Sequence, residues 1–211
     1  MKFLSCKKVL CLSPHPDDVE YAIAGTIKKC NQTKFESFCF SASGRNDKTV
    51  TQNRYSEIVK FWSMFKCKNL KQSWSVECYI QDKPFEEWVE LIENLINEGG
   101  FDCVLVPSSE DSHNDHKYIN SMIEPILRVN NANFIEYKTP SSLNNWIPNL
   151  FVDITEQVDS KIDCLYNSFV SQNNKSYFEK NNIKNFHINF QCLKKGVKYV
   201  EQFKIVRYNL L

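Results

Sequence analysis

The sequence contains few of the residues that mark fibrous, disordered or membrane-spanning proteins. Glycine and proline account for only five and seven of its 211 residues, which argues against a collagen-like or low-complexity chain. No apolar run approaches the roughly 20 residues of a membrane-spanning helix, so we expect no transmembrane segment. Lys and Arg total 26 against 25 for Asp and Glu, a net charge of +1, which provides no broad basic surface for nucleic acid. The composition predicts a compact globular domain without a nucleic-acid partner.

Signals for disulfides and secretion are also missing. The nine cysteines are scattered and form no Cys-x-x-Cys pair, and Cys11, Cys39 and Cys103 fall inside apolar, strand-like runs. Free thiols in such runs behave as small hydrophobic side chains, which indicates a reducing compartment. Lys7 and Lys8 interrupt the apolar stretch near the N-terminus, and what remains is too short for the h-region of a signal peptide. We therefore expect a cytoplasmic protein.

Short apolar runs alternate with longer helical patterns along the chain. The expected strands cover residues 8–13, 35–41, 70–76, 101–106, 134–137 and 150–154. The expected helices cover residues 19–30, 50–65, 84–98 and 117–128, with a further helix beginning near Thr155. This alternation is typical of a mostly parallel sheet covered by helices. We predict an α/β fold with a Rossmann-like, mostly parallel sheet and helices on both faces, in a single domain over residues 1–211.

Three of the four histidines lie in two short polar clusters, each after an expected strand. The first, Pro-His-Pro-Asp-Asp, spans residues 14–18, and the second, His-Asn-Asp-His, spans residues 113–116. Ligands of open parallel sheets bind at the carboxyl ends of the strands. Two imidazoles and one carboxylate form a donor set typical of catalytic zinc, with a fourth position open to water. Because Asp17 and Asp18 are adjacent, we expect one to bind the metal and the other to accept a proton.

Each cluster also has a simpler explanation. A Pro-Asp-Asp turn before a helix is favourable N-cap chemistry, because carboxylates stabilise the positive end of the helix dipole. Residues 113–116 alone are compatible with an exposed loop that has no role. The occurrence of both clusters at expected strand ends favours a functional site.

In this order, the two clusters resemble the motifs of the LmbE/PIG-L family of zinc-dependent N-acetylglucosamine deacetylases. Further matches extend the resemblance over essentially the whole chain. They are Arg54 with Glu57, Val-Asp-Ile-Thr at residues 152–155 with Lys161, Ser171 with Gln172, and Tyr-Val-Glu-Gln-Phe at residues 199–203. The resemblance implies the same α/β fold.

The resemblance also implies a role for each site residue. It predicts three zinc ligands, which are His15, Asp18 and His116. It makes Asp17 the general base and His113 the acid or oxyanion stabiliser. It assigns Asp115 to orienting and charging His113. Two roles stay open for Arg54, binding an anionic group of the substrate or pairing with carboxylates, and the family match favours substrate binding.

The implied reaction is hydrolysis of an N-acetyl group on an amino sugar of the N-acetylglucosamine type or a glycoconjugate. Zinc can lower the pKa of bound water from about 15.7 to about 7, which supplies a nucleophile at neutral pH. We expect one zinc ion per chain and a small-molecule N-acetyl sugar as partner, and we leave a homo-oligomer open. Two alternatives are a catalytically silent sugar-binding scaffold of the same fold and a metal-dependent phosphoesterase. Metal content separates them, since the first would hold no ion and the second two.

Overall fold

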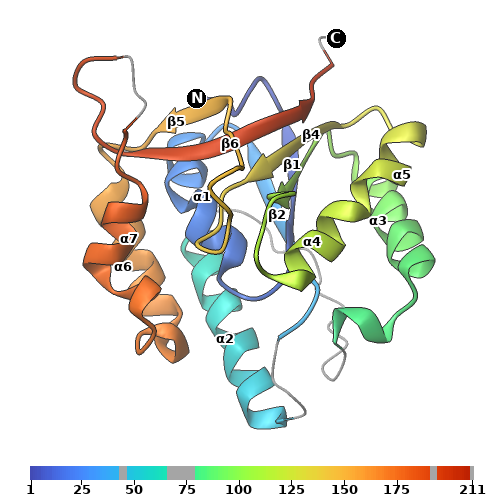
Figure 1. Ribbon diagram of the computed structural model, residues 1–211, viewed down its shortest axis with the longest axis horizontal. Helices are drawn as coiled ribbons and strands as arrows, with labels where there is room; N and C mark the ends of the chain where they lie inside the picture. The colour runs from blue at the N-terminus through green and yellow to red at the C-terminus, as the bar shows by residue number, and fades with distance from the viewer. Residues whose placement is uncertain (43–46, 66–78, 191–193, 210–211) are drawn as a thin grey trace.

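The computed structural model describes residues 1–42, 47–65, 79–190 and 194–209. Its six-stranded sheet has the order β2-β1-β3-β4-β6-β5 (Figure 1). The strands are β1 (Lys8–Ser13), β2 (Lys34–Cys39), β3 (Cys103–Pro107), β4 (Asn133–Tyr137), β5 (Leu150–Asp153) and β6 (Val200–Arg207). The first four strands pair in parallel, and β6 runs antiparallel to both β4 and β5. The prediction of a mostly parallel sheet is confirmed.

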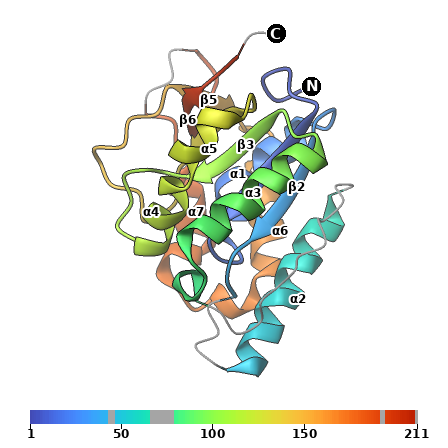
Figure 2. The ribbon, with the colours of Figure 1, turned by 90° about the vertical axis from the view of Figure 1, so that its right-hand side faces the viewer.

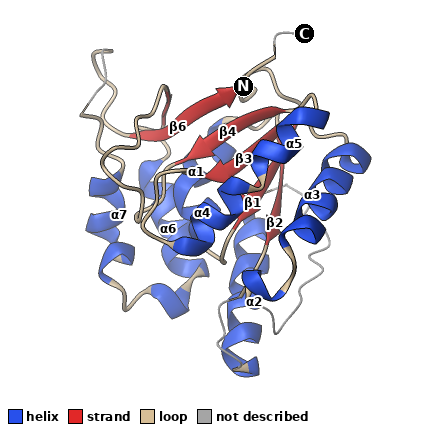
Figure 3. Ribbon diagram, turned by 45° about the vertical axis from the view of Figure 1, so that its right-hand side comes forward, coloured by secondary structure: helices blue, strands red, loops and turns tan. Residues whose placement is uncertain are grey.

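Helices cover both faces of this sheet, as expected (Figures 2 and 3). One face is covered by α1 (Asp18–Lys29), α2 (Lys48–Met64), α6 (Val158–Ser168) and α7 (Lys180–Phe186). The other face is covered by α3 (Phe85–Gly99), α4 (Asn114–Ser121) and α5 (Ile123–Val129). None of the described helices is long and apolar enough to cross a membrane.

Strand β1 shows why the sheet is buried on both sides. Successive side chains of a strand point to opposite faces. Val9 and Cys11 accordingly pack into the core beneath α1 and α2, whereas Leu10 and Leu12 pack into the core beneath α3. An uninterrupted apolar run therefore serves two cores at once, as is typical of central parallel strands.

Close packing fixes the position of α1, which carries the first polar cluster at its N-terminus. A Cβ atom at Gly25 would lie 2.7 Å from Cγ2 of Ile154, so only glycine allows α1 to approach the end of β5 so closely.

Cysteines contribute to the same core. The buried described thiols are those of Cys6, Cys11, Cys30, Cys39 and Cys103, and none of the described cysteines forms a disulfide.

Two expected helices differ from the prediction. The helix expected over residues 117–128 is two helices, α4 and α5, that meet at Met122. Pro125 has no N–H to donate to the carbonyl group of Ser121, so a continuous helix loses a hydrogen bond there. The helix expected near Thr155 begins at Val158, because the Thr155 hydroxyl accepts hydrogen bonds from the N–H groups that lead into β6. The strand expected over residues 70–76 lies outside the described residues.

Candidate active site

The first polar cluster forms a tight turn between β1 and α1. Asp17 has φ 102° and ψ −28°, a left-handed conformation that is unusual for a residue with a side chain. Its N–H donates to Oε2 of the buried Glu20 at 3.0 Å, and Nε1 of Trp62 donates to Oε1 of the same carboxyl group at 2.6 Å. Such conformations persist where surrounding contacts hold them, and they cluster at functional sites. In this turn the side chains of Asp17 and Asp18 have different partners.

The second polar cluster forms the start of α4, beside the end of β3. His113 is the N-cap of α4, and its Nδ1 accepts a hydrogen bond from the N–H of Asp115 at 3.2 Å. Asp111, which our sequence analysis missed, holds this loop in place. Its Oδ1 accepts the N–H of His113 at 2.8 Å, and its Oδ2 lies 3.0 Å from Nδ1 of His116 and 2.6 Å from Oγ1 of Thr139. A carboxylate five residues before His116 in the same loop was the available signal.

The topology brings His15, Asp18 and His116 together, and we call these three residues the ligand cluster. One potential ligand atom from each lies within 4.8 Å of the other two. Oδ2 of Asp18 lies 3.2 Å from Nδ1 of His15 and 3.3 Å from Nε2 of His116. A second group of potential donors, which shares His15, adds His113 and Asp115.

Charge in the ligand cluster is unbalanced without a cation. Burial lowers the pKa of His116, but Asp18 and Asp111 outweigh it and raise that pKa to about 10. Burial also lowers the pKa of His15, but hydrogen bonds to Asp115 and Asp18 raise it to about 9. Burial raises the pKa of Asp18, but the two histidines outweigh it and hold that pKa well below its usual range. The metal-free cluster thus takes up protons, and its donor set of two imidazoles and one carboxylate fits a divalent cation.

Asp17 lies beside the ligand cluster and has its own partners. Oδ1 of Asp17 is 2.6 Å from Nη2 of Arg54, which also donates to the carbonyl oxygen of Pro16. Oη of Tyr177 lies 3.3 Å from Oδ2 of Asp17 and 3.3 Å from Oε1 of Gln172. Burial raises the pKa of Tyr177, so its phenol stays protonated and can donate. Burial raises the pKa of Asp17, and the Arg54 guanidinium opposes this shift.

Arg54 makes the carboxylate pairing that was one of its two expected roles. Its guanidinium is buried and bonds to Asp17, Pro16 and Ser171. Although Arg54 lines the cavity, its charge is already compensated by Asp17. The structure therefore places the Arg54 guanidinium where it holds the carboxylate of Asp17.

The expected pairing of Asp115 with His113 is also corrected. Oδ2 of Asp115 lies 2.9 Å from Nε2 of His15, and its Oδ1 accepts from Nε2 of Gln81 at 2.6 Å. The backbone N–H of Asp115 donates to Nδ1 of His113. Because of this contact, the Asp115 side chain is directed to His15 instead. Burial and then the nearby His116 and His15 lower the pKa of His113, so we expect a neutral ring. With Nδ1 accepting, the proton of this ring lies on Nε2.

The ligand cluster and Asp17 open into one cavity of about 760 Å³. Loops that follow all four parallel strands contribute to its walls, as does the segment after α6. Besides the residues already described, the lining includes Ser41, Ala42, Val50, Tyr79, Pro140, Ser141 and Lys175. Sequence analysis predicted the floor of this cavity but none of these wall residues.

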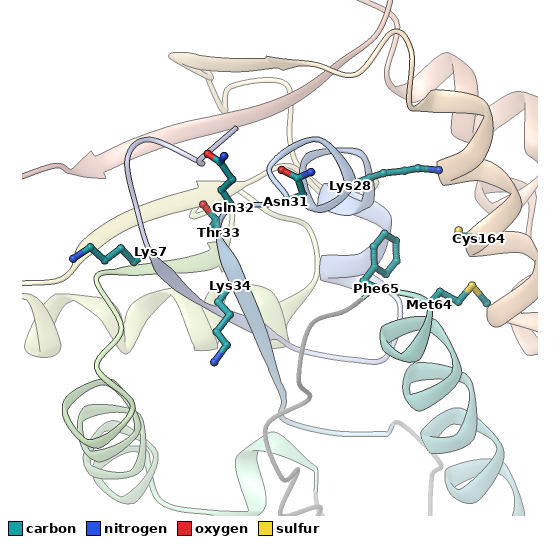
Figure 4. A pocket seen from close by; sticks show the side chains of 9 residues that line it. All are labelled: Lys7, Lys28, Asn31, Gln32, Thr33, Lys34, Met64, Phe65 and Cys164. Carbon is teal, nitrogen blue, oxygen red and sulfur yellow. The ribbon is translucent and has the colours of Figure 1, made fainter.

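A second cavity, of about 530 Å³, lies at the opposite ends of β1 and β2 (Figure 4). Its lining includes Lys7, Lys28 and Lys34, which gives it a basic character. In Figure 4 these three side chains point away from one another, so their ammonium groups do not converge on one ligand position. This contrasts with the ligand cluster, whose donor atoms all lie within 4.8 Å of one another.

The remaining sequence motifs pair with one another in space. Glu57 accepts from the N–H of Ser171 at 2.6 Å and from its Oγ at 2.7 Å, which joins α2 to η2 (Val170–Gln172). Nζ of Lys161 on α6 lies 2.5 Å from Oε1 of Glu201 on β6, and both side chains are fully buried. The first contact joins motifs that are more than a hundred residues apart, and the second joins motifs on neighbouring elements. Both contacts support the N-terminal part of the fold.

A protein-family model described as "PIG-L: GlcNAc-PI de-N-acetylase" matches residues 10–127, which is more than half of the chain. The chain belongs to the PIG-L family. The match includes both polar clusters, so the resemblance noted in the sequence is confirmed. No curated protein sequence gives a match.

Solved structures with this fold include PIG-L-like deacetylases. The N,N'-diacetylchitobiose deacetylase from Pyrococcus horikoshii has a TM-score of 0.75 and 20% identity, and the alignment covers 96% of this chain and 85% of that one. The A40926 pseudoaglycone deacetylase Dbv21 has a TM-score of 0.71 and 14% identity, with 96% and 98% covered. The 4-carboxy-2-hydroxymuconate hydratase GalB from Pseudomonas putida KT2440 has a TM-score of 0.72 and 12% identity, with 97% and 98% covered. At these identities the similarity establishes the fold, and one fold here serves two kinds of reaction.

Proposed function

We propose that this protein is a zinc-dependent hydrolase that removes the acetyl group from an N-acetylated amino sugar or a glycoconjugate that carries one. The observation that carries the proposal is the ligand cluster, in which two imidazoles and one carboxylate meet at the positions of the PIG-L motifs. Because a hydratase shares the fold, the fold alone would not support this proposal.

The ligand cluster would hold one zinc ion through His15, Asp18 and His116. Asp111 supports this assignment because it bonds Nδ1 of the buried His116 and leaves Nε2 for the metal. Carboxylates behind a ligating histidine fix its orientation and raise its basicity. When bound, zinc supplies a water nucleophile at neutral pH and polarises the amide carbonyl group. The two candidate donor groups share His15, which favours one ion over the two of a typical phosphoesterase.

Asp17 would act as the general base. Arg54 donates to its Oδ1 and the Tyr177 phenol donates to its Oδ2, so the proton from the attacking water would go to the second lone pair of Oδ2. The same carboxyl group then returns the proton to the amine nitrogen as the C–N bond breaks, and the products are acetate and the free amino sugar. This carboxylate bonds to Arg54 and Tyr177, which lie outside the ligand cluster.

His113 would stabilise the oxygen of the former amide carbonyl group as negative charge develops on it. In the expected neutral tautomer, Nε2–H is a donor, and His113 lines the cavity beside the ligand cluster. A donor placed where charge develops lowers the barrier without being consumed. Our earlier expectation of an imidazolium charged by Asp115 is replaced by this neutral donor.

Acetate release from a panel of N-acetylglucosaminides tests the proposal. Zinc-loaded protein is expected to release acetate from at least one member, and Asp17→Asn to lower kcat by on the order of a hundredfold. Asp163→Asn, which changes an exposed carboxylate on α6, is the matched control and keeps full activity. Release from no member would contradict the deacetylase assignment, and wild-type turnover by Asp17→Asn would contradict its role as base.

A further inference from the structure

The turn between β1 and α1 holds one peptide group by both of its polar atoms. This group joins Pro16 to Asp17. Its carbonyl oxygen accepts a hydrogen bond from Nη2 of Arg54, and its N–H donates to Oε2 of Glu20 at 3.0 Å. The two side chains come from different helices, α2 and α1, and both are buried. The peptide group therefore cannot rotate without losing two buried hydrogen bonds.

The orientation of this peptide group determines the backbone conformation of Asp17. With φ 102° and ψ −28°, Asp17 lies in the left-handed region. Rotation of the peptide group by about 180° would bring φ to roughly −80° and leave ψ unchanged, which is an ordinary right-handed helical conformation. Because the observed conformation is the less favourable one for a residue with a side chain, contacts around the turn have to hold it.

Rotation would also disturb the carboxylate of Asp17, because one atom of Arg54 binds both groups. Nη2 of Arg54 donates to the carbonyl oxygen of Pro16 and to Oδ1 of Asp17. After rotation, the N–H of Asp17 would face this nitrogen in place of the carbonyl oxygen, and two donors would meet. Arg54 would then leave its place beside the carboxylate. Glu20 thus acts on the carboxylate of Asp17 through the peptide group and Arg54.

Trp62 fixes Glu20 in turn. Its Nε1 donates to Oε1 of Glu20 at 2.6 Å, and both side chains are fully buried. The two oxygens of Glu20 therefore each face an N–H donor. A carboxylate accepts from both donors at once, whereas an amide has only one acceptor atom. Trp62 and Arg54 both belong to the buried side of α2, so this helix holds the peptide group directly through Arg54 and indirectly through Glu20.

We propose that Glu20, fixed by Trp62, is a positioning residue for the general base. It keeps the peptide group of the turn on Arg54, and so keeps the Asp17 carboxylate in the arrangement in which Arg54 binds Oδ1 and Oδ2 receives the proton. This inference rests on the proposed function, in which Asp17 is the base. Misplacement of a reacting group by about 1 Å can cost roughly a hundredfold in rate, so a side chain that is not in contact with substrate can still affect turnover.

Three single variants test the inference. Glu20→Gln places an amide NH₂ group against one of the two N–H donors, and Trp62→Phe removes the donor to Glu20. Glu36→Gln is the matched control, because it changes a buried carboxylate on β2 that pairs with Lys8. We expect Glu20→Gln to lower kcat for acetate release by roughly tenfold or more, with KM and zinc content close to those of wild type. Trp62→Phe should lower kcat by a smaller factor, and Glu36→Gln should keep the wild-type kcat.

A background without the base separates positioning from general damage to the fold. In Asp17→Asn, the added change Glu20→Gln should lower kcat little further, because a residue that acts through Asp17 has no base left to position. An equal fall of kcat in both backgrounds, an unchanged kcat in Glu20→Gln, or loss of zinc from Glu20→Gln would overturn the inference. Trp62→Phe carries the same comparison if Glu20→Gln does not fold.

Hydrogen exchange of the Asp17 N–H, followed by NMR, separates this inference from the proposed function. We expect slow exchange in wild type and Glu36→Gln, and faster exchange in Glu20→Gln and Trp62→Phe. Exchange as slow in Glu20→Gln as in wild type would overturn the inference. Exchange that depends on Glu20, with no acetate released by wild type, would support the hold on the turn and contradict the reaction. Acetate release that does not depend on Glu20 would overturn the inference and leave the deacetylase assignment intact.

Discussion

Helix α1 contacts two groups of buried charged residues, and they differ in how their charge is compensated. In its middle, Glu201 accepts from the N–H groups of Gly25 and Thr26 at 2.8 and 2.6 Å and pairs with Lys161, which also donates to the carbonyl group of Ala22. At its N-terminus, the ligand cluster opens into a cavity and takes up protons to balance its charge. The closed pair joins α1 to α6 and β6, whereas the open cluster has a donor set that fits a divalent cation.

The largest effect is expected at the closed pair. Glu201→Gln leaves the Lys161 ammonium buried without a counter-charge, which we expect to lower the free energy of unfolding by about 3–5 kcal/mol. Chemical denaturation measures this change. Asp163→Asn removes one partner of an exposed pair and is expected to cost at most about 1 kcal/mol.

A double variant, Lys161→Met with Glu201→Gln, sharpens the result because it removes both charges. We expect it to recover most of the lost stability, since replacing a buried ion pair by uncharged groups is often neutral. A loss below about 1 kcal/mol in Glu201→Gln alone would show that this pair does not hold α1.

The next largest effect is expected at Asp111, whose carboxylate hydrogen-bonds to a histidine of the ligand cluster. Asp111→Asn removes the carboxylate that bonds Nδ1 of His116, and we expect zinc affinity to fall by roughly 10- to 100-fold. Competition with a chelator of known affinity measures the change. Asp159→Asn, which pairs with Lys184 on the protein surface, is the control. Unchanged affinity in Asp111→Asn would assign Asp111 to loop structure alone.

A separate effect is expected in the pH dependence of the metal-free protein. The pKa values of His15 and His116 are raised in the folded state to about 9 and about 10, from about 6.5 in the unfolded chain. A raised pKa contributes stability below pH 6.5 that is lost as pH rises through the folded value. Chelated wild type should therefore lose stability between pH 6.5 and 10, and His116→Ala should show a shallower decline. Parallel declines in both proteins would contradict the charge imbalance.

Much of the fold and the floor of the site follow from the sequence, because both depend on local patterns. Uninterrupted apolar runs such as β1 specify central parallel strands, and polar clusters after two of these strands place the ligand cluster at one edge of the sheet. Pro125 indicated that the helix expected over residues 117–128 is divided at Met122, but our prediction did not take this proline into account.

The partners of individual side chains were not predictable in the same way. Asp115 turns to His15 because the N-cap at His113 uses its backbone N–H, a detail that sequence spacing does not reveal. Tyr177 reaches Asp17 across 160 residues of chain. Such contacts depend on how loops pack after the sheet has formed, and no periodicity in the sequence records them.

Metal analysis of purified protein tests the central claim most directly. After incubation with zinc and desalting, wild type and Asp17→Asn should each hold about one ion per chain, because Asp17 is outside the ligand cluster. His116→Ala should lose that ion, since two remaining protein ligands are too few for a catalytic zinc site. Full zinc occupancy in His116→Ala, or none in wild type, would contradict the account.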